Sequence, residues 1–285
     1  MTTRQRRGAV THLRAAYPVS DRRACRLVQL ARSRWQYHPH RPDDGPLAAA
    51  LAAKAAERPR WGYRRLALLL ARDGWTVNRK RVLRVYREAG LRIRKRRRRK
   101  QVSTARVPRP VAAAANAQWT LDFITDAFTS GRKFRVLSIV DEFTRECLAL
   151  RADVSQPSTK VVAAVEEIAR CRGVPQRLII DHGPEFVAKT LDAWAYARGV
   201  ELSFTRPAKP VDNCFVESFH DKFRDECLST HWLRDLPEAQ RLIEAWQEDY
   251  NTVRPHQGLG YRTPAAYAAL LDENTELESA LTTPA

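Results

Sequence analysis

Apolar residues in the first hundred positions recur at helical rather than strand spacing. Residues 1–44 are predicted to form a short helical region, in which Ser20 fits the N-cap position before a helix-forming run. Three further helices are predicted at 47–56, 63–72 and 79–89, and Asn78 is a suitable N-cap for the last of them. This succession predicts a helix-turn-helix domain, with 79–89 as its recognition helix.

From residue 117 onward the pattern changes to short strands and helices. Strands are predicted at 118–128, 134–143, 146–152, 177–181 and 200–204, and helices at 158–172, 186–198, 213–227 and 237–250. This order favours an α/β fold, in which helices pack on a mixed sheet. The Pro- and Ala-rich segment 101–116 is interpreted as a linker between a domain at 45–100 and one at 117–272, and 273–285 is expected to be a disordered tail.

Charge is divided unevenly between these parts. Residues 1–100 contain 29 Lys and Arg against six Asp and Glu, whereas the rest of the chain contains 21 against 26. A basic part favours a polyanionic partner, and nucleic acid fits better than a membrane surface because the aromatic residues of this part occupy core-like positions. The chain contains no apolar stretch of about 20 residues, which is the length that spans a bilayer. We therefore expect an intracellular protein that does not contact membranes.

Basic side chains that could contact DNA lie on the predicted recognition helix and just after it. Four of them are left to face outward when the apolar residues of the helix pack inward: Arg79, Lys80, Arg84 and Arg87. Seven consecutive basic residues follow: Arg94, Lys95, Arg96, Arg97, Arg98, Arg99 and Lys100. Such a run repels itself unless phosphates neutralise it. A solvated helix face and a plain flexible linker are the alternative interpretations.

Three acidic residues stand in apolar surroundings. Asp122 lies inside an apolar strand, Asp181 follows an apolar strand and precedes a Gly-Pro turn, and Glu217 is flanked by apolar residues on a predicted helix. A carboxylate among apolar neighbours is costly unless it is paired or binds a metal ion. No two of the five cysteines have zinc-ligand spacing, so carboxylates are the candidate ligands. Three carboxylates suit two Mg²⁺ ions, which activate the attacking oxygen and stabilise the leaving oxygen of a phosphodiester.

Other acids compete for these roles. Asp126 shares the strand face of Asp122, because a separation of four residues preserves the face, and spacing alone does not choose between them. Asp141 lies on the adjacent predicted strand. Glu185 is near Asp181 but is predicted to begin a helix, where the positive end of the helix dipole stabilises a carboxylate, so a structural role is expected for it.

Motifs around these acids resemble those of a known family. The order Asp, Asp, Glu, with 35 residues between the last two, is similar to the retroviral-integrase core of the DDE recombinases, which has a ribonuclease-H-like fold. More narrowly, the chain resembles the OrfB-type transposases of the "IS three" insertion-sequence family. The matching segments are 61–65, 77–82, 119–122, 140–145, 181–186, 209–228 and 250–264. The Trp-x-x-Asp motif selects Asp122 over Asp126, and His182 and His220 stand where the family usually has asparagine.

The resemblance implies a polynucleotidyl transferase that cleaves and joins the ends of an insertion sequence. Asp122, Asp181 and Glu217 are then the catalytic residues and the ligands of two Mg²⁺ ions, for which Mn²⁺ can substitute. The implied core has a mixed five-stranded sheet with helices on both faces, preceded by a small all-helical helix-turn-helix domain. Arg224, two turns beyond Glu217 on the same helix, is expected to contact the transposon end.

The resemblance also implies partners. These are double-stranded DNA, as the terminal inverted repeats and the target, and the upstream OrfA product, either fused or separate. A homo-oligomer on DNA and a location in the bacterial cytoplasm, associated with the nucleoid, are also expected. Two alternatives stay open. A non-catalytic DNA-binding regulator of transposition would bind the ends without metal-dependent cleavage, and a ribonuclease-H-like nuclease would cut without joining.

Overall fold

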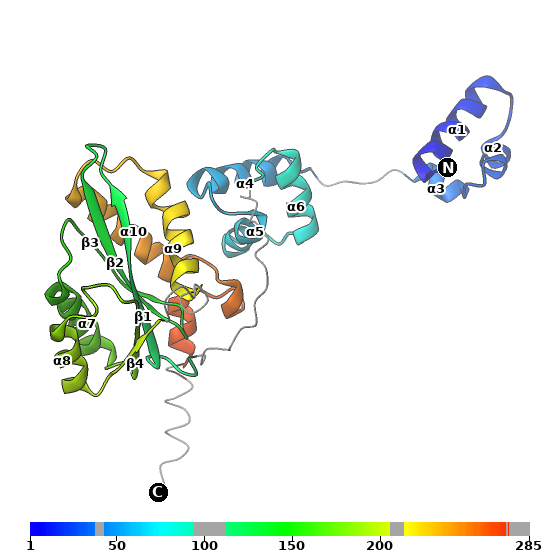
Figure 1. Ribbon diagram of the computed structural model, residues 1–285. Coiled ribbons are helices and arrows are strands. Elements are labelled where there is room, and N and C mark those ends of the chain that lie inside the picture. Colours follow the sequence, from blue (N-terminus) through cyan, green and yellow to red (C-terminus); the bar gives the residue numbers. More distant parts are fainter. Residues whose placement is uncertain (38–42, 94–111, 206–213, 272, 274–285) are drawn as a thin grey trace, which may run out of the picture. The chain divides into compact units, whose positions relative to one another are not determined.

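The computed structural model describes residues 1–37, 43–93, 112–205, 214–271 and 273. It divides into two compact units, Met1–Ala50 and Leu51–Ala285. The first unit contains α1 (Thr3–Ala16), α2 (Asp21–Leu27) and α3 (Arg32–Gln36), drawn in blue in Figure 1. Val10, Ala24, Cys25 and Leu30 form its small core. The Ser20 side chain accepts a hydrogen bond from the backbone N–H of Arg23, which confirms the predicted N-cap of α2.

The three helices predicted ahead of the linker are present. They are α4 (Gly45–Glu57), α5 (Tyr63–Arg72) and α6 (Arg79–Glu88). The Asn78 side chain caps α6 by accepting from the backbone N–H of Lys80 at 2.8 Å. Helices α5 and α6 pack together and bury Leu66, Leu70, Val82 and Val85. The basic run 94–100, most of the predicted linker and the tail after residue 273 lie outside the described residues.

The second half of the chain forms one mixed five-stranded sheet. Its strands are β1 (Gln118–Ala127), β2 (Lys133–Asp141), β3 (Cys147–Asp153), β4 (Arg177–Ile180) and β5 (Glu201–Phe204), in the order β3-β2-β1-β4-β5. The first three strands pair antiparallel, whereas β4 pairs parallel with both β1 and β5. All five strands are found where the sequence pattern predicts them, within two residues at each end.

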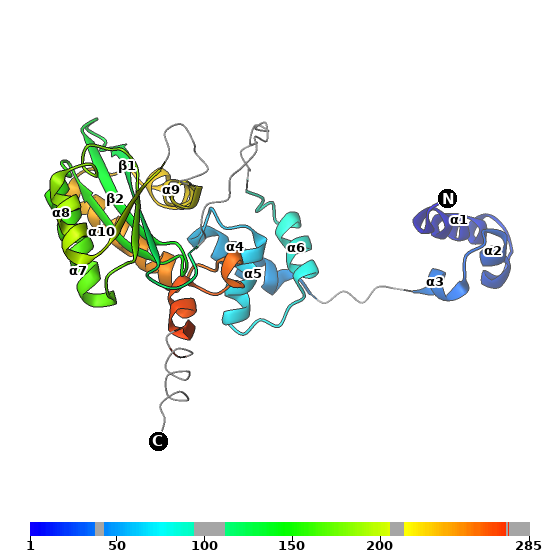
Figure 2. The same ribbon diagram turned by 60° about the horizontal axis from the view of Figure 1, so that its bottom comes forward.

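Helices cover both faces of this sheet (Figures 1 and 2). Side chains alternate along β1, so Trp119 and Leu121 pack with α7 (Ser158–Arg172) and α8 (Lys189–Arg198), whereas Ile124 packs on the opposite face. That opposite face is covered by α9 (Cys214–Glu226) and α10 (Leu236–Thr252), through Phe219, Phe223 and Trp246. Two short 3₁₀ helices, Leu228–Thr230 and Gln257–Leu259, follow α9 and α10. The fold is the predicted integrase-type core.

One boundary differs from the prediction in a way that matters for the site. Helix α8 begins at Lys189 and not at residue 186. The carbonyl of Gly183 instead accepts from the backbone N–H groups of Phe186 and Val187, and this turn places Phe186 in the core, where it is 1% exposed. Glu185 therefore does not lie at the N-terminus of a helix, and the helix-dipole explanation for it is wrong.

None of the helices in the described ranges is both long and apolar enough to cross a membrane.

Candidate active site

The pairing of β1 with β4 places Asp122 and Asp181 at corresponding positions along neighbouring chain segments. In the parallel pair of β1 and β4, Thr120 lies opposite Ile179. Asp122 and Asp181 each follow two residues later, and Asp181 is the first residue after the end of β4. The carboxyl end of a parallel strand is where an open α/β sheet presents its chemistry.

The carboxyl group of Asp122 is largely buried and has a shifted pKa. Its side chain is 19% exposed and accepts a hydrogen bond from the backbone N–H of Phe123 at 2.7 Å. Burial, together with the negative charges of Asp181 and Glu217, raises the pKa of Asp122 to about 6 against the opposing effect of the Phe123 hydrogen bond. All three predicted carboxylates therefore interact electrostatically at this end of the sheet.

Asp181 is held by the turn that follows it. Its Oδ1 accepts from the backbone N–H of Gly183 at 2.8 Å. A Cβ atom at residue 183 would lie 2.9 Å from that same oxygen, so any larger residue there would force the Asp181 carboxylate to shift. The neighbouring His182 is exposed, and its ring packs against Phe204 in a tilted arrangement with ring centroids 5.2 Å apart, so it packs toward β5.

Glu217 projects from the exposed side of the first turn of α9, which packs on β1. The helical period puts His220, Asp221 and Arg224 on the same side of α9 as Glu217. Arg224 is exposed, and its positive charge contributes to lowering the pKa of His220. The basic residue that the resemblance assigns to the transposon end thus lies on the same helix face as the acid.

His220 and Ser138 belong to this site, although the sequence did not assign them a role there. Ser138 is fully buried on β2 opposite Asp122, and its hydroxyl donates to the backbone carbonyl of Asp122 at 3.0 Å. The same hydroxyl lies 2.7 Å from Nε2 of His220, and Nδ1 of His220 is 3.7 Å from Oδ2 of Asp122. Burial lowers the pKa of His220 to about 4, so the imidazole is neutral at pH 7. From the sequence, Ser138 could have been paired with Asp122 only by predicting the register of β1 against β2.

The competing acids have other surroundings. Asp141 is fully buried and accepts hydrogen bonds from the backbone N–H groups of Asn116, Phe143 and Thr144, so it holds a turn. Glu185 forms an ion pair with Arg135, which lowers the pKa of Glu185. Asp126 lies near the C-terminal end of β1. There its charge contributes, after burial, to raising the pKa of Cys227.

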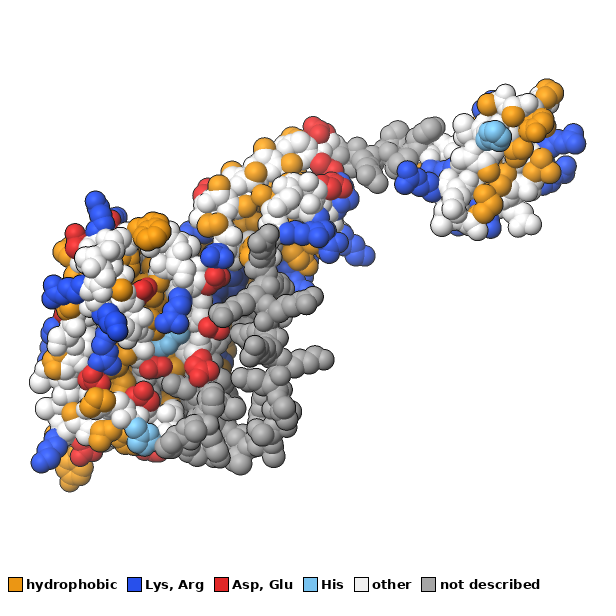
Figure 3. All heavy atoms as spheres, turned by 45° about the horizontal axis from the view of Figure 1, so that its top comes forward, with side chains coloured by type: hydrophobic (Ala, Val, Ile, Leu, Met, Phe, Trp, Pro, Cys, Tyr) orange, Lys and Arg blue, Asp and Glu red, His pale blue; other side chains and the backbone are white. Residues whose placement is uncertain are grey.

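The donor set fits a hard divalent cation by its chemistry. Three carboxylates supply the oxygen ligands that Mg²⁺ prefers, and a cation among them would relieve the repulsion that raises the pKa of Asp122. The three side chains do not form a ready set of ligands in this structure. The described residues contain no group of three or more His, Cys, Asp or Glu close enough to hold a metal ion. Figure 3 shows acidic side chains on one face of the core.

The predicted DNA-binding side chains on α6 have unequal surroundings. Lys80 and Arg87 are exposed. Arg79 is also exposed, and its guanidinium lies 5.7 Å from the centroid of the Tyr261 ring. Arg84 is half-buried and pairs with Glu88 at 2.9 Å. The seven basic residues from Arg94 to Lys100 lie outside the described residues.

Family models match consecutive parts of the chain. A model described as an HTH-like domain matches residues 43–100. Two models described as an integrase core domain match residues 112–210 and 198–264. Together they follow the order of the helices and the sheet described above.

Relatives and solved structures agree with this assignment. The chain is 44% identical over 259 residues to a 31.7 kDa protein of insertion element IS407 from Burkholderia multivorans, covering 90% of this chain and 93% of the relative. It is 28% identical to the transposase InsD of the IS2 insertion element from Escherichia coli, covering 79% of each. A chain of the simian T-cell lymphotropic virus intasome, solved with the PP2A regulatory subunit B56 gamma, has the same fold, with a TM-score of 0.50 at 13% identity over 76% of this chain and 74% of that one. This chain therefore belongs to the OrfB-type transposases of the "IS three" insertion-sequence family, with an HTH-like domain followed by an integrase core.

Proposed function

We propose that this chain is a DNA transposase that cleaves the ends of its insertion sequence and joins them to another DNA strand in a metal-dependent reaction. The observation that carries the proposal is the electrostatic coupling of the three carboxylates, in which Asp181 and Glu217 both raise the pKa of Asp122. Perturbed acids of this kind cluster at functional sites. Membership of the transposase family supports the same assignment.

In this proposal Asp122, Asp181 and Glu217 hold two Mg²⁺ ions, with Mn²⁺ as a substitute. A metal pair supplies Lewis acidity for the attacking and leaving oxygens of a phosphodiester. The chain's own groups orient these ligands. The Phe123 and Gly183 N–H groups fix one oxygen each of Asp122 and Asp181, and Ser138 holds the backbone beside Asp122. Glu217, on a helix and exposed, has the freedom to adjust its position.

DNA binding is assigned in the proposal to the basic N-terminal part of the chain. The exposed Lys80 and Arg87 on α6, together with the run Arg94–Lys100, would contact phosphates of the terminal repeats. Figure 3 shows Lys and Arg side chains gathered at one edge of the helical segment that precedes the core. Arg224 would contact the transposon end next to the acids.

The decisive experiment incubates the full chain with labelled element ends and Mg²⁺ or Mn²⁺. Asp181→Asn is expected to abolish cleavage and joining while DNA binding stays nearly unchanged, because the amide keeps the shape of the side chain but loses its charge. Asp126→Asn is the matched control on the same sheet, and it should retain activity. Full activity of Asp181→Asn would overturn the mechanism.

The same assay separates the alternatives. A wild-type chain that binds the ends but never cleaves them in the presence of metal would be a regulator of transposition. A chain that cuts without ever joining would be a ribonuclease-H-like nuclease. We further propose that the active form is an oligomer on DNA that includes the upstream OrfA product, and assays with and without that product test this part.

A further inference from the structure

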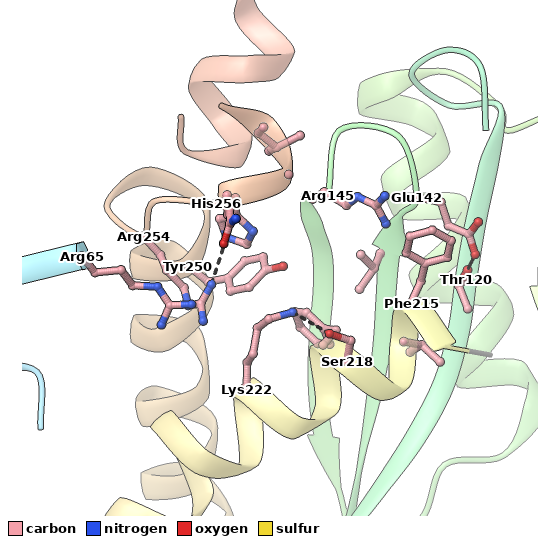
Figure 4. A pocket seen from close by; sticks show the side chains of 16 residues that line it. Arg65, Thr120, Glu142, Arg145, Phe215, Ser218, Lys222, Tyr250, Arg254 and His256 are labelled. Atoms are coloured by element: carbon pink, nitrogen blue, oxygen red, sulfur yellow. Dashed lines mark hydrogen bonds between the residues drawn. The ribbon is translucent and has the colours of Figure 1, made fainter. Parts of the chain in front are cut away.

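A second charged site lies on the opposite side of α9 from Glu217. A cavity of about 400 Å³ is lined by residues of α9, the end of α10 and the segment after it, by residues of β1, β2 and the turn that follows β2, and by one residue of α5. This volume falls in the range of small-ligand pockets, about 300–1,000 Å³. The helical period gives α9 two polar sides, because Ser218 and Lys222 line the cavity whereas Glu217, His220 and Arg224 do not. Figure 4 shows Ser218 and Lys222 among the side chains that line the cavity.

The lining of this cavity is strongly cationic. Four basic side chains contribute to it: Arg65, Arg145, Lys222 and Arg254. Among the described lining residues, Glu142 is the one acid, and its carboxylate accepts from the hydroxyl of Thr120. Just outside, Glu226 balances part of the charge by accepting from Arg254 at 2.7 and 2.8 Å and from Arg65 at 3.2 Å. One carboxylate thus forms ion pairs with two guanidinium groups.

Lys222 adds a further positive charge to the lining of the cavity. Its ammonium group donates to Ser218 Oγ at 2.9 Å, and no carboxylate of the described part of the chain lies within ion-pair distance of it. Burial, together with the positive charges of the neighbouring arginines, lowers the pKa of Lys222 to about 8 against the opposing effect of Glu226. The same cations contribute to lowering the pKa of the neighbouring His256. Positive charges that line one cavity repel one another, and an anion bound between them relieves this repulsion.

We propose that this cavity is a phosphate-binding site, in which Lys222, Arg254 and Arg65 receive a phosphate group. Arginine and lysine together suit phosphate, since the ammonium group acts as a point charge and the guanidinium N–H groups that do not donate to Glu226 can donate to phosphate oxygens. The half-buried Phe215 side chain, over which the Arg145 guanidinium lies at 4.0 Å, gives the cavity an aromatic wall that suits an attached nucleotide. The site is separate from the three carboxylates, so it does not rest on the proposed chemistry.

Residue-specific labelling tests this assignment without any reference to catalysis. The full chain is acylated at pH 8 with a lysine reagent, and modification of Lys222 is followed by mass spectrometry. Inorganic phosphate at constant ionic strength should slow the modification of Lys222 several-fold. Lys189, an exposed lysine on α8, is the internal control and should react at an unchanged rate. Equal protection of both lysines, or of neither, would overturn the proposal.

Variants provide the second measurement. The thermal midpoint of the wild-type chain should rise with phosphate more than with chloride of the same ionic strength. Lys222→Gln should weaken phosphate binding about tenfold, the loss expected for one charge-assisted hydrogen bond. Lys222→Arg should retain most of the binding, and Lys189→Gln should behave as the wild type. A phosphate response that survives unchanged in Lys222→Gln would contradict the site.

Two sources could supply the phosphate group. A short DNA duplex carrying an element end is added in the labelling experiment as a second arm. Protection of Lys222 by the duplex at concentrations far below those of inorganic phosphate would identify a DNA phosphodiester as the ligand. Protection by phosphate and by free nucleotides but not by the duplex would support the site and identify a mobile phosphate compound as its occupant.

Discussion

Asp122 illustrates how a proposed metal ligand costs stability at the scale of one residue. It is largely buried and under the electrostatic influence of two other carboxylates, and its pKa is raised to about 6 from 3.8. A carboxyl group with a raised pKa binds its proton more tightly in the folded state than in the unfolded state. The folded state therefore loses stability as the pH rises from about 4 to about 6, and the full penalty remains above that range.

This penalty predicts a stabilised variant. Without metal, Asp122→Asn should unfold at higher urea concentration than the wild type at pH 7, by at most about 3 kcal/mol, the equivalent of about two pKa units. The difference should shrink toward zero near pH 4, where Asp122 is protonated in both states. Mg²⁺ should narrow the difference at pH 7, because only the wild type gains from binding the cation. A difference that does not vary with pH would contradict this explanation.

Ser138 offers a second test at the same scale. Its fully buried hydroxyl bridges the Asp122 carbonyl and the His220 ring. Ser138→Ala should destabilise the fold by about 1–3 kcal/mol, because two buried polar groups lose their partner. Ser155→Ala, at an exposed serine, should change the unfolding midpoint by less than about 0.5 kcal/mol. An equal effect of the two substitutions in urea unfolding would show that the bridge is not formed.

At the scale of elements, three faces of α9 lie in three different environments. Glu217, His220 and Arg224 turn toward the candidate active site, Phe219 and Phe223 pack against the sheet, and Lys222 lines the cavity. A helix of 13 residues can do this because its period of 3.6 distributes neighbouring residues around the axis. Moving α9 would therefore disturb the acids and the cavity together.

The sequence predicted the elements better than it predicted their tertiary partners. Strand and helix positions followed from hydrophobic period, and the acids stood out because each has apolar neighbours. The pairing of Arg65 with Glu226 joins residues 161 positions apart, and no local pattern encodes it. The start of α8 was misplaced for a similar reason, since burial of Phe186 requires a turn where the residues alone favour a helix.

Glu226 is the residue through which α9 is tied to α5 and to the segment after α10. Its carboxylate pairs with Arg254, whose side chain is 1% exposed, and with Arg65. Glu226→Gln should destabilise the protein by about 3–5 kcal/mol, because it leaves a buried guanidinium without its counter-ion. Glu167→Gln removes an exposed pair with Arg151 and should cost less than about 1 kcal/mol. Similar unfolding midpoints for these two variants would disprove the role of Glu226.

At the scale of the whole molecule, the division of charge predicts how the protein binds DNA. Residues 1–100 hold most of the excess of Lys and Arg, whereas the rest of the chain is slightly acidic. Phosphate contacts release counterions, and each contact adds about 0.9 to the slope of log affinity against log salt concentration. Because Lys80 and Arg87 are exposed on α6, replacing both with glutamine should weaken binding to an element end and lower that slope by about 2.

The matched control removes two exposed cations from the core. Arg170 and Lys189 lie on α7 and α8, and their double glutamine variant loses the same net charge. If binding depended on net charge alone, both double variants would lose affinity and slope equally in fluorescence anisotropy titrations at several salt concentrations. If the helical segment positions the DNA, only the α6 variant loses slope. Asp181→Asn should then keep the wild-type slope, since it alters the candidate active site and leaves every cation of the N-terminal part in place.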